Sequence, residues 1–98
     1  MNEVIKNIEL WGEAKGILPN PDKMAQWNKT LEEVEELKDA IESNNLEEAK
    51  DAIGDIVVTL VMQCGGWGLS LDECVESAYN VISKRTGKMV DGQFVKDA

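Results

Sequence analysis

Carboxylate side chains are concentrated in the middle of this 98-residue chain, at spacings that suit metal chemistry. Ten of the 19 Asp and Glu residues lie at positions 32–55 with only two basic residues, so this segment carries a net charge of −8. Glu33 and Glu36 are three residues apart, which places them one turn from each other on a helix, where they can share a cation. Such a segment is either a solvated acidic face or a cation site.

Asp55 stands within an otherwise apolar segment, residues 52–62, which we expect to form a central helix. A bare carboxylate there is costly, so Asp55 should be paired, hydrogen-bonded or bound to a metal ion. Asp51 lies one turn earlier on the same side of that helix. An ion pair of Asp55 with Lys29 or Arg85 is the alternative to a metal. Ligand sets made of oxygen alone favour Mg²⁺, with Mn²⁺ also possible.

The composition argues against several other classes of protein. The chain has no histidine, which removes most zinc sites, Ser-His triads and Glu-x-x-His di-iron bundles. Its net charge of −9 argues against nucleic-acid binding. No membrane span or signal peptide is recognisable, so we expect a cytoplasmic protein. Cys64 and Cys74 are then expected to be reduced thiols rather than a disulfide.

Four helices are predicted to position these side chains within a single domain. We expect them at residues 3–15, 21–43, 46–63 and 70–85, followed by a tail at residues 86–98. Asn20-Pro21 predicts the start of the second helix, and Ser70 with Glu73 predicts a capping box at the start of the fourth. Nothing in the tail indicates a strand. The fold class is therefore all-α, and the short connections favour an antiparallel four-helix bundle.

An apolar stripe at helical spacing follows the second predicted helix. Its members are Met24, Trp27, Leu31, Val34, Leu37 and Ile41. We expect Trp27 to lie in the core. A chain this short leaves much apolar surface uncovered, so we predict that the bundle is completed by oligomerisation, as a homodimer or homotetramer.

The ordered motifs resemble the MazG-like all-α nucleoside triphosphate pyrophosphohydrolases. The first motif is Glu32-Glu33-Val34-Glu35-Glu36, preceded by Gln26-x-x-Lys29, and the second aligns on Ile53-Gly54-Asp55. The segment from Ala78-Tyr79-Asn80 to Phe94-Val95-Lys96 is similar to the short phage and prophage members. The family has a glutamate three residues before its second-motif aspartate, where this chain has Ala52. Either Asp51 or Glu48 replaces that ligand, or water does.

This resemblance implies Mg²⁺-dependent hydrolysis of (deoxy)nucleoside triphosphates to the monophosphate and pyrophosphate. The expected metal ligands are Glu33, Glu36, Asp55 and Asp51, with Glu32 or Glu33 as the catalytic general base. The expected substrate-binding residues are Gln26, Lys29, Asn80, Lys84, Arg85, Lys88 and Trp11. The basic residues near the C-terminus either close over the phosphates as a clamp or cap the fourth helix and solubilise the tail.

Two other functions stay open at this point. One is a phosphoribosyl-ATP pyrophosphohydrolase-like enzyme of the same superfamily. The other is a non-catalytic acidic helical bundle that binds a partner protein or a nucleotide, an alternative that the alanine at position 52 keeps open.

Overall fold

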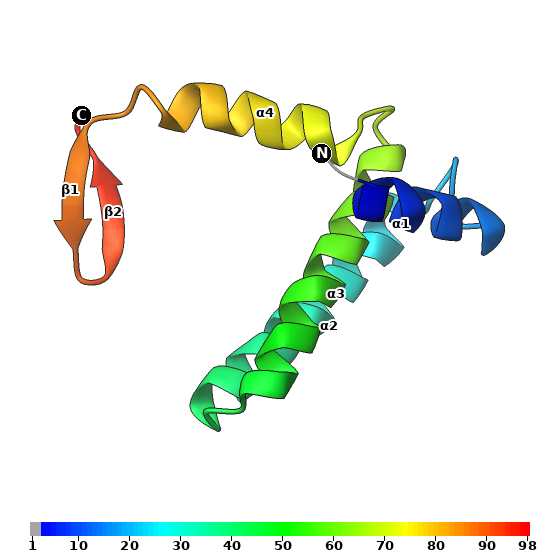
Figure 1. Ribbon diagram of the computed structural model, residues 1–98, viewed down its shortest axis with the longest axis horizontal. Helices are drawn as coiled ribbons and strands as arrows, with labels where there is room; N and C mark the ends of the chain where they lie inside the picture. The colour runs from blue at the N-terminus through cyan, green and yellow to red at the C-terminus, as the bar shows by residue number, and fades with distance from the viewer. Residues whose placement is uncertain (1–2) are drawn as a thin grey trace.

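Four helices and one small hairpin make up the computed structural model, which describes residues 3–98 (Figure 1). The elements are α1 (Glu3–Ala14), α2 (Lys23–Glu42), α3 (Leu46–Gly65), α4 (Leu71–Ile82), β1 (Gly87–Val90) and β2 (Gln93–Lys96). The prediction of four helices is confirmed, whereas the prediction of a tail without strands is wrong. None of the described helices combines the length and apolar character that crossing a membrane requires.

Side-chain caps set where the helices begin. Asp22 accepts a hydrogen bond from the backbone N–H of Ala25 at 3.0 Å and is the N-cap of α2, so this helix starts after Asp22 and not at the predicted Asn20-Pro21. The predicted capping box of α4 is confirmed, since Ser70 and Glu73 each accept a hydrogen bond from the other's backbone N–H. The α4 helix ends three residues before the predicted position 85, while α3 extends two residues beyond position 63.

The α2 and α3 helices lie side by side and form an antiparallel pair (Figure 1). Ala40 on α2 and Ala52 on α3 are 1% and 2% exposed, and such small side chains allow the helices to approach closely. Between them, the Thr30 hydroxyl donates to the Thr59 hydroxyl at 2.8 Å, and Thr59 in turn donates to the carbonyl of Ile56 at 2.7 Å. The pair is thus joined by small residues and a buried hydroxyl chain.

Most of the apolar stripe of α2 is exposed within the single chain. Trp27 is 49% exposed and Ile41 is 68% exposed, so the prediction that Trp27 lies in the core is wrong for the single chain. The face of α2 that becomes buried carries Thr30, Glu33 and Ala40 instead. The hydrophobicity of a helix face indicates that the face favours burial. It does not indicate whether the face packs within its own chain or against another molecule.

The α3 helix is central, because it contacts α1, α2 and α4. Near its end, the sulfur of the buried Met62 occupies the space beside Gly12 of α1, 2.6 Å from where a Cβ would stand, so that α1 approaches closely. Beyond α3, the chain turns, and α4 extends away from the α2–α3 pair (Figure 1). No residue of α4 is buried. The single chain therefore does not form the predicted antiparallel four-helix bundle.

The end of the chain is a β-hairpin with a two-residue turn. Val90 pairs with Gln93, and the intervening Asp91 and Gly92 both have positive φ, at 49° and 80°. An Asp-Gly pair with these angles forms the tight turn that suits the twist of two antiparallel strands. This signal is present in the sequence. Every residue of both strands is exposed.

Candidate metal and nucleotide site

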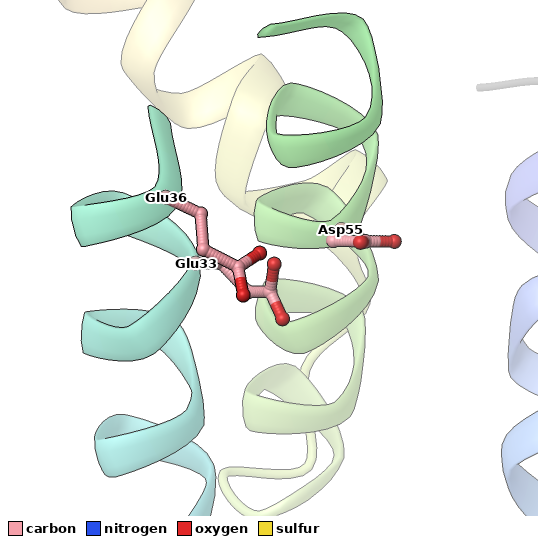
Figure 2. Close-up of side chains that lie close together, drawn as sticks. All are labelled: Glu33, Glu36 and Asp55. Carbon is pink, nitrogen blue, oxygen red and sulfur yellow. The ribbon is translucent and has the colours of Figure 1, made fainter. Parts of the chain in front are cut away.

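Three carboxylates, two from α2 and one from α3, lie close together (Figure 2). Glu33 and Glu36 extend from adjacent turns of α2, and Asp55 extends from the middle of α3. One oxygen of each carboxylate lies within 4.8 Å of an oxygen of the other two. The spacing of the glutamates places them together on α2, and the antiparallel packing brings the aspartate to the same level. The cluster offers only oxygen ligands, which suit Mg²⁺ or Mn²⁺.

Glu33 is the buried member of this cluster, with 6% exposure, whereas Glu36 and Asp55 are exposed. Within the single chain, the expectation that Asp55 is the carboxylate set in apolar surroundings is therefore wrong. In the described part of the chain, Glu33 Oε2 is buried without a hydrogen-bond partner. Burial raises the pKa of Glu33, and neighbouring Glu36 raises it further, whereas Lys29 opposes the shift. A buried carboxylate oxygen without a donor is a fitting ligand for a cation.

Lys29 lies on the same side of α2 as the cluster. Its Nζ is 3.3 Å from Glu32 Oε2 and 3.6 Å from Glu33 Oε1. The ion pair with Glu32, and then the charge of Glu33, raises the pKa of Lys29, which keeps the side chain protonated at neutral pH. Within residues 3–98, Lys29 thus pairs with these two glutamates, and the alternative in which it pairs with Asp55 is not formed.

A cavity of about 460 Å³ opens beside the carboxylates. It is lined by Trp11, Ile17, Gln26, Lys29, Glu33, Asp55, Val58, Thr59 and Met62. Three of the predicted substrate-binding residues, Trp11, Gln26 and Lys29, are brought together here. Val58 and Met62 were not predicted from the sequence, although they stand three and seven residues after Asp55, a spacing that places them on the same face of α3. One part of the cavity is charged and another is apolar and aromatic.

A second, more acidic cavity of about 370 Å³ is also lined by Asp55. Its lining comprises Glu36, Asp39, Glu48, Asp51, Ala52 and Asp55. The structure therefore places Asp51 and Glu48 in this cavity, while the cluster within 4.8 Å consists of the other three carboxylates. Asp39 was not singled out from the sequence, although it stands three residues after Glu36.

The basic residues of the C-terminal part lie elsewhere in the chain. Asn80 and Lys84 line a groove on α4, Arg85 lines another groove with Phe94, and Lys88 belongs to β1. None of these four predicted substrate-binding residues lines either of the cavities that contain carboxylates. Within one chain, the structure does not bring them to the carboxylate cluster.

One protein family matches most of the chain. Residues 22–90 match the family described as MazG nucleotide pyrophosphohydrolase domain. The chain belongs to this MazG family. The match begins at the N-cap of α2, contains the carboxylate cluster and extends to the end of β1. The resemblance inferred from the motifs is thereby confirmed. In this MazG domain, α1 precedes the matched segment and supplies Trp11 to the cavity.

A curated relative comes from a bacteriophage. The MazG chain is 34% identical over 62 residues to an uncharacterized 18.2 kDa protein in the rep-hol intergenic region of Haemophilus phage HP1 (strain HP1c1). The alignment covers 63% of this chain and 38% of the phage protein, so the chain matches well under half of that relative's length. No solved structure matches the chain.

Proposed function

We propose that this MazG-family chain hydrolyses nucleoside triphosphates to the monophosphate and pyrophosphate in a Mg²⁺-dependent reaction. The observation that carries the proposal is the buried, unpartnered oxygen of Glu33, in a cluster with Glu36 and Asp55, beside a cavity with an apolar part. Membership of the MazG nucleotide pyrophosphohydrolase family supports the same reaction class.

The carboxylate cluster would hold the cation. Glu33, Glu36 and Asp55 each offer an oxygen, and Asp51 in the adjoining cavity is the nearby candidate for a further or water-mediated ligand. When bound, Mg²⁺ or Mn²⁺ neutralises phosphate charge and acts as a Lewis acid on the phosphoryl group. The residues present fit this ion, since the donors are all oxygens and one of them is otherwise buried without a partner.

The reaction adds water across the bond between the α- and β-phosphates, and pyrophosphate leaves. Lys29 binds a phosphate oxygen from the same side of α2 as the cluster. With Oε2 as the ligand of the cation, Glu33 would orient the attacking water and accept its proton at Oε1, which is 3.6 Å from Lys29 Nζ. Glu32 is exposed and bonded to Lys29, so its role is to position that lysine.

The nucleobase would occupy the apolar part of the larger cavity. Trp11 supplies an aromatic face, and Ile17, Val58 and Met62 supply an apolar wall. Gln26 lines the same cavity, and its side-chain amide can both donate to and accept from the polar edge of a base. Base binding and phosphate binding would then use opposite parts of one cavity.

The exposed apolar stripe of α2 favours assembly into a homodimer or homotetramer. Cys64 and Cys74 are free thiols, which fits the reducing conditions of the cytoplasm as the compartment. Light scattering during gel filtration tests the assembly directly, because the single chain has a mass of 10.9 kDa.

The test of the function is release of pyrophosphate from a panel of ribo- and deoxyribonucleoside triphosphates with Mg²⁺. We expect Glu36→Gln and Asp55→Asn to lose at least about 100-fold in rate, as removal of a charged metal ligand does. Glu35→Gln is the matched control, since this exposed residue of α2 lines neither carboxylate cavity. Full activity of both cluster variants would contradict the site, and an inactive wild type would contradict the enzyme.

The same panel separates the two alternatives. Phosphoribosyl-ATP is included as a substrate, and its preferential hydrolysis would identify the enzyme of the same superfamily. A chain that binds Mg²⁺ and nucleotide in calorimetry but releases no pyrophosphate would be a non-catalytic binding module.

A further inference from the structure

The two cysteines of the chain lie close together where α3 is followed by α4. Cys64 is the residue before the last one of α3, Cys74 is the fourth residue of α4, and their sulfur atoms are 3.9 Å apart. Both are free thiols, of which Cys64 is buried and Cys74 is partly exposed. The sequence contains two cysteines in 98 residues, so the fold brings its whole complement of thiols to one place.

The backbone around both cysteines is held by hydrogen bonds. The carbonyl of Cys64 accepts from the N–H groups of Trp67 and Leu69, both at 3.0 Å, and these bonds close the turn after α3. The N–H of Cys74 donates to the carbonyl of Ser70 at 3.3 Å, and Ser70 is itself fixed by the capping box of α4. The proximity of the two thiols therefore follows from a hydrogen-bonded turn and a capped helix.

A small movement separates this pair of thiols from a covalent bond. The sulfurs of a disulfide are about 2.05 Å apart, so the two atoms would have to approach by roughly 1.9 Å. Rotation of the partly exposed Cys74 side chain about its Cα–Cβ bond moves the sulfur over distances of this size. The bond would close a ring of residues 64–74.

The two thiols differ in their access to a reagent. Cys74 is partly exposed, so a small oxidant can reach its sulfur. Cys64 is 8% exposed, and burial, followed by the neighbouring Cys74, raises the pKa of Cys64 to about 11. Because the thiolate is the form that attacks an oxidant, we expect Cys74 to react first and Cys64 to react second, within the fold.

We propose that Cys64 and Cys74 form a reversible oxidation site, at which a hydroperoxide converts the two thiols into a disulfide between α3 and α4. With hydrogen peroxide, the Cys74 thiolate attacks one oxygen, an S–O bond forms as the O–O bond breaks, and the other oxygen leaves as water. The Cys64 sulfur then attacks the Cys74 sulfur, an S–S bond forms as the S–O bond breaks, and the oxygen leaves as water with the proton of Cys64. The two sulfurs give up two electrons to the peroxide, and a small dithiol restores both thiols by exchange. This site does not depend on the proposed nucleotide chemistry.

The position of Cys64 compensates for its weak ionisation in the second step. At pH 8, only about one Cys64 in a thousand is a thiolate. Groups that are held in contact, however, can act on each other at effective concentrations on the order of 10⁵ M. The product of the two factors is on the order of 100 M, which exceeds the concentration of any thiol in solution. Cys64 should therefore reach the oxidised Cys74 before an external thiol does.

The disulfide would tie α4 to the best anchored end of the molecule. Trp67, which lies within the ring of residues 64–74, has the Nζ of Lys23 4.1 Å from its ring centre, and Gln63 Nε2 donates to the carbonyl of Lys23 at 3.1 Å. The end of α3 is thus joined to the start of α2, whereas α4 has no buried residue. Oxidation would fix the start of this little-buried helix to the central helix of the chain.

The first experiment asks whether the disulfide forms. The reduced protein is treated with hydrogen peroxide, the remaining thiols are blocked with N-ethylmaleimide in urea, and intact masses are measured without reductant. We expect a single-chain species about 2 Da lighter than the reduced protein, which takes up maleimide only after treatment with dithiothreitol. Cleavage after Glu73 separates the two cysteines, so the disulfide is then seen as two joined peptides. Disulfides mainly between chains, or a sulfinic acid at Cys74 in place of the disulfide, would overturn the proposal.

Two serine variants test the order of the two steps. In Cys64→Ser, Cys74 should still react with peroxide and, lacking its partner, should persist as a sulfenic acid that dimedone captures. In Cys74→Ser, Cys64 should react at least about tenfold more slowly, because burial suppresses its thiolate. The same two variants in urea are the matched control, since both thiols are then exposed and the difference should disappear. Equal rates in the two folded variants would overturn the assignment of Cys74 as the first thiol to react.

The third experiment asks whether the native fold favours the bond. The protein is equilibrated with reduced and oxidised glutathione, folded and in urea. A disulfide that fits the fold also stabilises it, so its equilibrium constant should be at least about tenfold larger in the folded protein, and oxidation should raise the Tm by on the order of 10 °C. Cys64→Ser treated with the same peroxide should show no such rise in Tm. A smaller equilibrium constant in the folded protein than in urea would overturn the proposal, because the fold would then oppose the bond.

Discussion

Lys29 Nζ lies 3.6 Å from Glu33 Oε1 across one turn of α2, yet the other oxygen of Glu33 is buried and has no hydrogen-bond partner in the described chain. The lysine thus compensates only part of a carboxylate that is 6% exposed. Exposed Glu36 and Asp55 add negative charge beside it. Without a cation, this arrangement costs stability, and binding a cation relieves the cost.

Glu33→Gln is therefore expected to stabilise the metal-free protein at neutral pH. Burial, and then Glu36, raises the pKa of Glu33 above its ordinary value of 4.5. Because the pKa of Glu33 is higher in the folded protein, protonation of this carboxyl stabilises the fold at pH values below 4.5. This stabilisation is lost as the pH rises through the raised pKa. In EDTA at pH 7, we expect the free energy of unfolding of the variant to exceed that of the wild type by on the order of 1 kcal/mol, measured by urea denaturation.

The same variant should respond weakly to Mg²⁺. The Tm of the wild type is expected to rise with Mg²⁺ concentration by mass action, while that of Glu33→Gln changes little. At pH 4 in EDTA, the difference in stability between the two proteins should vanish, because the wild-type carboxyl is then largely protonated. A variant that is less stable than the wild type in EDTA at pH 7 would contradict the interpretation of Glu33 as an uncompensated buried charge.

Lys29→Gln tests the contribution of Lys29 to phosphate binding separately from metal binding. Lys29 is the basic residue that lines the cavity next to Glu33 and Asp55, and a charge-assisted hydrogen bond to phosphate is worth on the order of 1.5 kcal/mol. We expect KM for the triphosphate to rise about tenfold, while Mg²⁺ binding without nucleotide is unchanged or tighter, because a competing cation has been removed.

Initial rates of pyrophosphate release and calorimetry with Mg²⁺ alone measure these two quantities. Lys38→Gln serves as the control, since it removes the same charge from an exposed position of α2 that lines neither carboxylate cavity. An unchanged KM in Lys29→Gln would show that this lysine does not bind the substrate.

Local signals in the sequence predicted the helices well and predicted their packing poorly. Ser70 and Glu73 specify a cap through their own side chains, so the start of α4 follows from a few adjacent residues. Trp27 is different. The helical spacing of Trp27 and its neighbours identifies an apolar face, but it does not identify what that face packs against. The exposure of Trp27 is instead set by how α2 packs on α3. The hairpin was missed although Asp91-Gly92 is a known turn signal, because the flanking strands are only four residues long.

In the candidate site, too, the positions of residues on one helix were predicted well, whereas burial between helices was not. Glu33 and Glu36 were predicted together because their spacing alone puts them on one face of a helix. Asp55 was predicted to join them from its position in the second motif, and the structure brings the three together. The sequence assigned the buried position to Asp55 instead of Glu33, because the apolar residues around Asp55 are adjacent in sequence but do not enclose its side chain. Burial depends on how α2 packs against α3, which no single helix reveals.

The hydroxyl pair Thr30–Thr59 is expected to show strong coupling between α2 and α3. The hydroxyls are 2.8 Å apart and both residues are buried. Each of Thr30→Val and Thr59→Val should lower the free energy of unfolding by about 1 kcal/mol, because the replaced side chain leaves a buried hydroxyl with one partner fewer. The double variant should lose clearly less than the sum of the two, since each single variant already removes the one hydrogen bond between the two hydroxyls. Urea denaturation of the four proteins in EDTA measures the cycle, and strict additivity would contradict the coupling.

Cys64 is expected to resist alkylation until the pH is high. Burial, and then its neighbour Cys74, with the two sulfurs 3.9 Å apart, raises the pKa of Cys64 to about 11. The reactive species is the thiolate, so at pH 8 only about one Cys64 in a thousand is reactive, and the rate of labelling by iodoacetamide should rise about tenfold per pH unit up to pH 10. Mass spectrometry of the peptide that contains Cys64 follows the reaction, and the same protein in urea, where burial is lost, provides the control. Rapid labelling of this residue in the folded protein at pH 7.5 would show that the end of α3 opens readily, and a labelling rate independent of pH would show that opening, and not ionisation, limits the reaction.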